Sequence, residues 1–185
     1  MAMSLDCFYS NNKGQTGGAL TPLPGGGYFT DYVAFDSFKG FPDGTSVSEH
    51  PIYTSGHVKT GEQEFLDLLR SYGQSLNRVR LVSGFYEESL NQDLAAEFKK
   101  RSSRASLVCI DCNLYESYRA ALTWCDEFLQ PGAIVYLDDF NTFRAQHDRG
   151  PRRAWNEYLN SSRWDFEQFL NVGWGGRSFV VQNKH

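Results

Sequence analysis

Three aspartates stand directly after short apolar runs, where carboxylates could hold a cation or move a proton. Asp111 follows the run at residues 107–110, and Asp138 and Asp139 follow the run at residues 133–137. Clustered carboxylates repel and raise one another's pKa values, and a hard divalent cation such as Mg²⁺ removes that penalty. Capping of the next turn or helix would explain one such aspartate more easily than three. We therefore expect a metal site made by these three aspartates.

The two apolar runs flank an amphipathic helix, which is the pattern of a strand–helix–strand unit in a parallel sheet. The helix ends at Pro131-Gly132, and its inner stripe comprises Tyr118, Ala121, Leu122, Cys125, Phe128 and Leu129. A right-handed crossover places the ends of both strands at the same sheet edge, where ligands bind. Neighbouring strands are about 5 Å apart, so Asp111 is expected within reach of the aspartate pair.

Strand and helix patterns alternate along the rest of the chain. Strands are predicted at 32–35, 78–82, 107–110 and 133–137, helices at 62–72, 92–100, 115–129 and 152–159, and an antiparallel hairpin at 166–170 and 178–182. This order predicts an α/β, Rossmann-like, doubly wound, mostly parallel sheet with a C-terminal hairpin, in a single domain over residues 1–185. Residues 1–27, rich in Gly, Asn and Pro, are expected to be loop-like or disordered.

Further candidate residues follow other predicted strands or lie in polar loops. Asp36 ends a strand, where it could accept ribose hydroxyls or cap a turn, and both readings stay open. His57 and His147 lie in polar loops and could act as a base or be simply solvated.

Composition narrows the class of protein. The net charge of −4 argues against a nucleic-acid partner, and the one basic cluster, Arg144 to Arg153, is local. No apolar run approaches the roughly 20 residues that span a bilayer, so no membrane partner is expected. The first residues lack the regions of a signal peptide, and Cys109 and Cys112 lack a second pair for zinc. We expect a cytoplasmic protein, and leave a homo-oligomer open.

Several short segments resemble the sequence boxes of the macrocin-type O-methyltransferases, which methylate sugar hydroxyls of antibiotics. Residues 35–42 (FDSFKGFP) resemble the "(Y/F)DSFEGLP" box, and residues 110–117 (IDCNLYES) resemble "(I/H)DxDLYES". Residues 137–140 (LDDF) are similar to "(V/I)DDY". Weaker likenesses occur at residues 84–86 and 152–155. The boxes fall in the family's order over roughly residues 32–160, and together they are fairly specific.

The resemblance implies a class I methyltransferase fold, S-adenosylmethionine as donor and Mg²⁺ as cofactor. The implied metal ligands are Asp111, Asp138 and Asp139. The implied donor-binding residues are Asp36 and Ser37 near the adenosine half, Gly84 and Phe85 near the adenine, and Asp111 between donor and metal. The implied reaction is in-line transfer of the sulfonium methyl group to a sugar oxygen, accelerated by positioning and charge.

The chain departs from the family pattern at two places. Asn113 stands where the family has an acid proposed as the general base, and an amide cannot accept that proton. Either His57 or His147 replaces it, or the hydroxyl ionises without a protein base, or activity is lost. The family's first strand and glycine loop are only poorly matched by residues 6–9 and 14–16. The first βα unit is therefore expected to be degenerate or truncated.

These patterns predict an O-methyltransferase, dependent on S-adenosylmethionine and Mg²⁺, that acts on a hydroxyl of a sugar, polyol or glycosylated metabolite. One alternative is a catalytically silent binding protein of the same fold, favoured by Asn113 and the unusual N-terminal segment. The other is a metal-dependent glycosyl- or nucleotidyltransferase, against which stands the absence of a Walker-type glycine loop with lysine.

Overall fold

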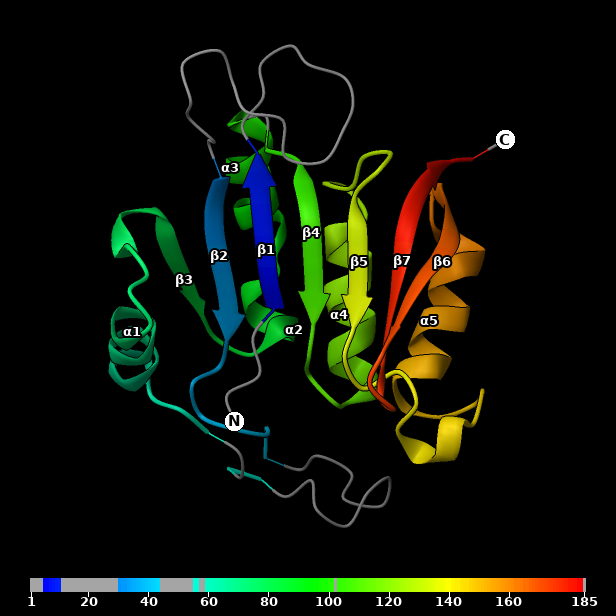
Figure 1. Cartoon of the computed structure of the whole chain (residues 1–185), viewed down its shortest axis with the longest axis horizontal. Helices are drawn as coiled ribbons and strands as arrows, with labels where there is room; N and C mark the ends of the chain where they lie inside the picture. The colour runs from blue at the N-terminus through cyan, green and yellow to red at the C-terminus, as the bar shows by residue number, and fades with distance from the viewer. Residues whose placement is uncertain (1–4, 11–29, 44–54, 57–58, 102, 185) are drawn as a thin grey trace.

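The strands form one seven-stranded sheet in the order β3-β2-β1-β4-β5-β7-β6 (Figure 1). This computed structural model describes residues 5–10, 30–43, 55–56, 59–101 and 103–184. The strands are β1 Leu5–Ser10, β2 Thr30–Asp36, β3 Val79–Ser83, β4 Ala105–Ile110, β5 Ile134–Leu137, β6 Trp164–Val172 and β7 Gly176–Asn183. The helices are α1 Glu62–Ser71, α2 Tyr86–Ser89, α3 Gln92–Lys100, α4 Tyr115–Cys125 and α5 Gly150–Ser161, with short 3₁₀ turns η1 Leu76–Arg78 and η2 Phe143–Ala145.

Strand directions confirm the predicted α/β fold. β2 pairs with β3 in parallel, as β4 does with β5, and β7 lies antiparallel between β5 and β6. β1 is antiparallel to both β2 and β4, so five of the seven strands point the same way. The predicted C-terminal hairpin is the β6–β7 pair. Among the described helices, none has the length and apolar character needed to cross a bilayer.

The central strand β1 corrects part of the expectation for residues 1–27. Leu5–Ser10 is a strand rather than loop-like, while residues 1–4 and 11–27 lie outside the described part of the chain. Its first residue pairs with Phe35 and its last with Thr30, so β1 ends at the sheet edge where β2 begins. Parallel neighbours need a crossover, usually helical, whereas antiparallel neighbours do not. The sequence between β1 and β2 has no helical period, which agrees with the predicted degenerate first unit.

Helices α2, α3, α4 and α5 lie on one face of the sheet, and α1 lies beside β3 (Figure 1). The predicted inner stripe of the crossover helix is buried, although α4 ends at Cys125 and Phe128 and Leu129 follow it in a turn. Trp124 packs against Phe35, Phe98 and Phe128, with ring centroids 5.4, 5.7 and 4.7 Å away. This aromatic cluster joins α3 and α4 to the sheet and thereby fixes the end of β4.

Substitution of Phe128 tests whether this cluster holds the layer together. Phe128 is 0% exposed, so Phe128→Ala is expected to lower the free energy of unfolding by about 3–5 kcal/mol, through lost burial and a cavity. Urea denaturation followed by tryptophan fluorescence measures this change. Phe169→Ala is the matched control, because that ring on β6 is 53% exposed and its loss should change stability by less than about 0.5 kcal/mol. Equal losses in both variants would contradict the assignment of the core.

Candidate metal and donor site

Asp111, Asp138 and Asp139 meet at the edge where β4 and β5 end. One carboxylate oxygen from each lies within 4.8 Å of the others, and all three residues are half-buried. Ile110 pairs with Leu137 in the parallel ladder, so the residues that follow both strands emerge side by side. The chain turns at Asp138, and this turn lets two adjacent aspartates face one cluster. The structure thus brings the predicted triad together.

Neighbouring polar groups fix the orientation of these carboxylates. The Asn113 side-chain amide donates to Asp139 Oδ2 at 2.6 Å, and the Tyr136 hydroxyl donates to Asp138 Oδ1. The buried Tyr118 hydroxyl donates to the Ile110 carbonyl at 2.9 Å and lies 3.2 Å from the Asp139 backbone N–H, which donates to it. The ends of β4 and β5 are therefore tied together beneath the triad.

Electrostatics at the triad favour a bound cation. Burial raises the pKa of Asp139 to about 6, and the negative charge of Asp138 raises it further against a hydrogen bond from Asn113. No basic side chain contributes to this shift. Three oxygen donors from carboxylates at this spacing suit a hard divalent cation such as Mg²⁺, which would offset their repulsion. The residues present therefore fit the metal that the sequence led us to expect.

A pocket of about 450 Å³ opens beside the triad. Its lining includes the four residues expected to hold the donor, Asp36, Ser37, Gly84 and Phe85, together with Cys112, Leu114 and Ser117. The ends of β2 and β3 are joined there, because the Gly84 N–H donates to the Asp36 carbonyl at 2.9 Å. Burial raises the pKa of Asp36 to about 6, partly offset by the Phe38 N–H, which donates to Asp36 Oδ1 at 2.6 Å.

The segment from Asp111 to Leu114 connects the pocket with the triad. Asp111 and Asn113 face the carboxylate cluster, whereas Cys112 and Leu114 line the pocket. Asn113 has φ 54°, a left-handed conformation that Asn tolerates better than most residues. Burial, and then the charges of Asp139 and Asp111, raise the pKa of the Cys112 thiol. The two features are therefore neighbouring parts of one site.

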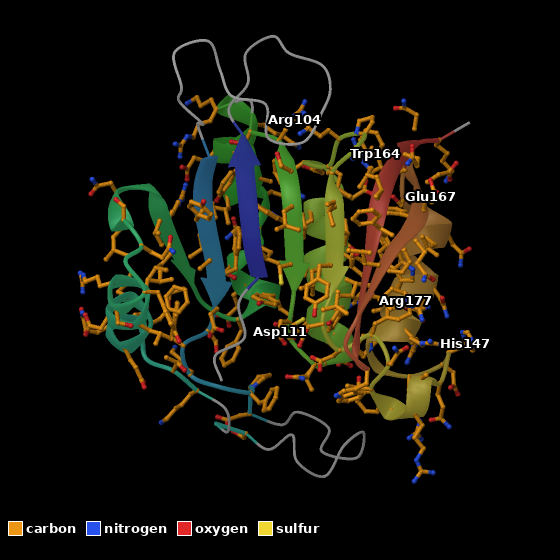
Figure 2. All side chains as sticks on the ribbon, in the orientation of Figure 1. Arg104, Asp111, His147, Trp164, Glu167 and Arg177 are labelled. Carbon is orange, nitrogen blue, oxygen red and sulfur yellow. The ribbon has the colours of Figure 1, made fainter. Side chains whose placement is uncertain are left out.

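The two histidines proposed as bases are not seen at the triad. His147 is exposed, and Figure 2 shows it at the outer end of its loop, well away from Asp111. His57 lies outside the described residues, as do residues 14–16, the candidate glycine loop. Among the catalytic candidates, only Asn113 is placed at the carboxylates, where it acts as a hydrogen-bond donor.

Two tyrosines were missed as site residues in the sequence. Tyr136 and Asp138 are two residues apart at a strand end, and this spacing could have indicated that they share a face. Tyr118 lies in the inner stripe of α4 and was assigned to the core, which is correct for its ring. Its hydroxyl role at Ile110 and Asp139 has no signal in the sequence.

Comparison with solved structures shows the same fold. The O-methyltransferase NovP superposes with a TM-score of 0.62 at 19% identity, over 82% of this chain and 60% of NovP. CalS11, a calicheamicin methyltransferase, gives 0.57 at 21% identity, over 80% of this chain and 59% of CalS11. An apo structure of CalS11, described as a TDP-rhamnose 3′-O-methyltransferase, gives 0.51 at 18% identity, over 80% of this chain and 57% of that one. The chain thus spans about 60% of the length of these proteins.

Sequence comparison supplies the family. No curated protein sequence matches the chain. The profile of the family described as Macrocin-O-methyltransferase (TylF) matches residues 28–171, which contain the triad and every described residue of the donor pocket named above. The chain therefore belongs to the macrocin O-methyltransferase family.

Proposed function

We propose that the protein is an O-methyltransferase that uses S-adenosylmethionine and Mg²⁺ to methylate a hydroxyl of a sugar or polyol. The observation that carries this proposal is the position of the carboxylate triad directly beside the pocket, within the fold of a methyltransferase family. A methyl donor in the pocket and a hydroxyl at the triad would be close enough for direct transfer. Membership of this family argues against the glycosyl- or nucleotidyltransferase alternative.

In this proposal the pocket holds the nucleoside half of the donor. Asp36 lines the pocket, and one of its oxygens already accepts the Phe38 N–H. Its other carboxylate oxygen would accept ribose hydroxyls, as carboxylates at this position in nucleotide-binding sheets commonly do. Gly84 and Phe85, after β3, would lie against the adenine ring. Burial of the pocket strengthens these contacts and excludes water from the donor.

Asp111, Asp138 and Asp139 would hold the cation. Bound there, Mg²⁺ would orient the acceptor and lower the pKa of the hydroxyl that is methylated. The chain's own contribution is to fix the carboxylates, through Tyr136 on Asp138 and Asn113 on Asp139. The amide of Asn113 cannot accept a proton, so we assign it a positioning role rather than that of a base.

The acceptor is proposed to be a sugar. CalS11, whose fold the chain shares, is described as a TDP-rhamnose 3′-O-methyltransferase, so a nucleotide-linked deoxysugar is a reasonable first substrate. A silent binding protein is the second candidate, because Asn113 replaces the expected acid and β1 runs opposite to the predicted direction. Donor binding without turnover would identify that second case.

The proposal is tested by titrating S-adenosylhomocysteine, the donor product, into the protein in a calorimeter. We expect micromolar binding in the presence of Mg²⁺, and transfer of labelled methyl from S-adenosylmethionine to TDP-rhamnose. Binding without transfer to any of a panel of sugars would support the silent alternative. Failure to bind the product, both with and without Mg²⁺, would refute the proposal.

Substitution of one carboxylate tests the cation site. Asp138→Ala removes one of the three oxygen donors, so its Kd for Mg²⁺ should rise at least roughly 100-fold, as measured by calorimetry. Asp148→Ala is the matched control, because Asp148 is an exposed aspartate of the neighbouring loop. Unchanged Mg²⁺ affinity in Asp138→Ala would show that the triad is not the metal site.

The pKa of Asp36 predicts how donor binding depends on pH. With a pKa near 6 in the free protein, the carboxylate is ionised above pH 6 and accepts ribose hydroxyls there. Below pH 6 it becomes protonated, so affinity for S-adenosylhomocysteine should fall about tenfold for each further pH unit. Asp36→Asn keeps the acceptor for the Phe38 N–H but should bind weakly with a flat pH profile. A wild-type affinity independent of pH between 5 and 8 would exclude this role.

A further inference from the structure

Trp174 occupies the turn between β6 and β7, and its side chain is unusually open to solvent. The residue is 79% exposed, whereas Trp124 and Trp155 are buried in the core. A large aromatic side chain left this exposed gains little from folding, and single exposed aromatics are most informative when they adjoin a binding site. The position of this turn therefore decides what the indole can do.

Asn141 fastens the turn to the loop that carries the triad. Its backbone N–H donates to the Gly175 carbonyl, and its side-chain amide donates to the Trp174 carbonyl, both at 2.9 Å. The side-chain oxygen of Asn141 accepts a hydrogen bond from Arg152 on α5 at 2.8 Å. Asn141 lies two residues after Asp139, so the turn and the triad move as one unit.

The turn also contacts the strand end that presents Asp138. A Cβ added at Gly175 would lie 3.2 Å from the Asp138 carbonyl oxygen. One added at Gly176 would lie 2.5 Å from the hydroxyl of Tyr136, the group that donates to Asp138. Any side chain at Gly176 would displace that hydroxyl, so glycine permits this close approach. Trp174 is therefore one residue, about 3.8 Å between Cα atoms, from a direct neighbour of the triad.

We propose that Trp174 is the acceptor-binding platform of the site, and that its indole stacks on the C–H face of a sugar ring. The proposal rests on the proposed function and names the residue that selects the acceptor. The face of an indole carries partial negative charge, and the ring C–H groups of a sugar carry partial positive charge. The hydroxyls on the ring edge would remain directed to the carboxylates. The triad would then define which oxygen is methylated, and Trp174 how the ring lies.

Saturation-transfer NMR with TDP-rhamnose and Mg²⁺ tests this platform, with and without S-adenosylhomocysteine. In the wild type we expect saturation of the rhamnose ring protons. In Trp174→Ala these signals should weaken strongly and the Kd should rise about tenfold, while Trp174→Phe should retain most of both. Tyr72→Ala is the matched control, because Tyr72 is 73% exposed at the end of α1 and should give wild-type values.

Three results would overturn the platform. The first is an unchanged Kd for TDP-rhamnose in Trp174→Ala. The second is a wild-type spectrum in which only nucleotide protons are saturated. The third is a change from dimer to monomer in Trp174→Ala by light scattering, since the indole would then belong to an interface between copies. Calorimetry with S-adenosylhomocysteine on the same samples reports separately on methyl-donor binding, so loss of the platform and failure of the proposed function are distinguishable.

Discussion

The crowding of three carboxylates at one edge of the sheet is the constraint on which the site depends. Asp111, Asp138 and Asp139 are half-buried with oxygens within 4.8 Å, and burial together with the charge of Asp138 raises the pKa of Asp139. The surrounding chain spends its polar groups on holding this arrangement, through the side chains of Tyr136 and Asn113. A fold that keeps like charges together without a basic partner in that shift is organised for a cation, and this argument underlies the proposed methyl transfer.

The reversed central strand changes how a donor could be bound. In the sheets this family is expected to use, the first strand runs parallel to its neighbours and a glycine loop follows it at the ligand edge. Here β1 starts at the edge of the triad, where Leu5 pairs with Phe35, and ends at the opposite edge, where Ser10 pairs with Thr30. Donor contacts among the described residues therefore come from the ends of β2, β3 and β4, which all meet at the pocket.

Much of this architecture could be predicted because it has a local cause. The apolar runs before Asp36, Asp111 and Asp138 marked strands, and the crossover rule placed their ends at one edge. The direction of β1 could not be predicted, because antiparallel and parallel strands of six residues share one pattern. The link from Asn141 to the β6–β7 turn joins residues more than thirty positions apart, and its hydrogen bonds leave no periodic trace. Long-range polar contacts of this kind set the site's shape, and only the structure reveals them.

The most direct test of the proposed cation site is anomalous diffraction from crystals soaked with Mn²⁺, a scatterer that takes the same oxygen ligands as Mg²⁺. The carboxylate triad predicts one strong anomalous peak at coordination distance from Asp111, Asp138 and Asp139, close to the mouth of the pocket. A map with no peak at these carboxylates, or with the ion bound elsewhere while they stay uncoordinated, would contradict the proposed metal-dependent chemistry.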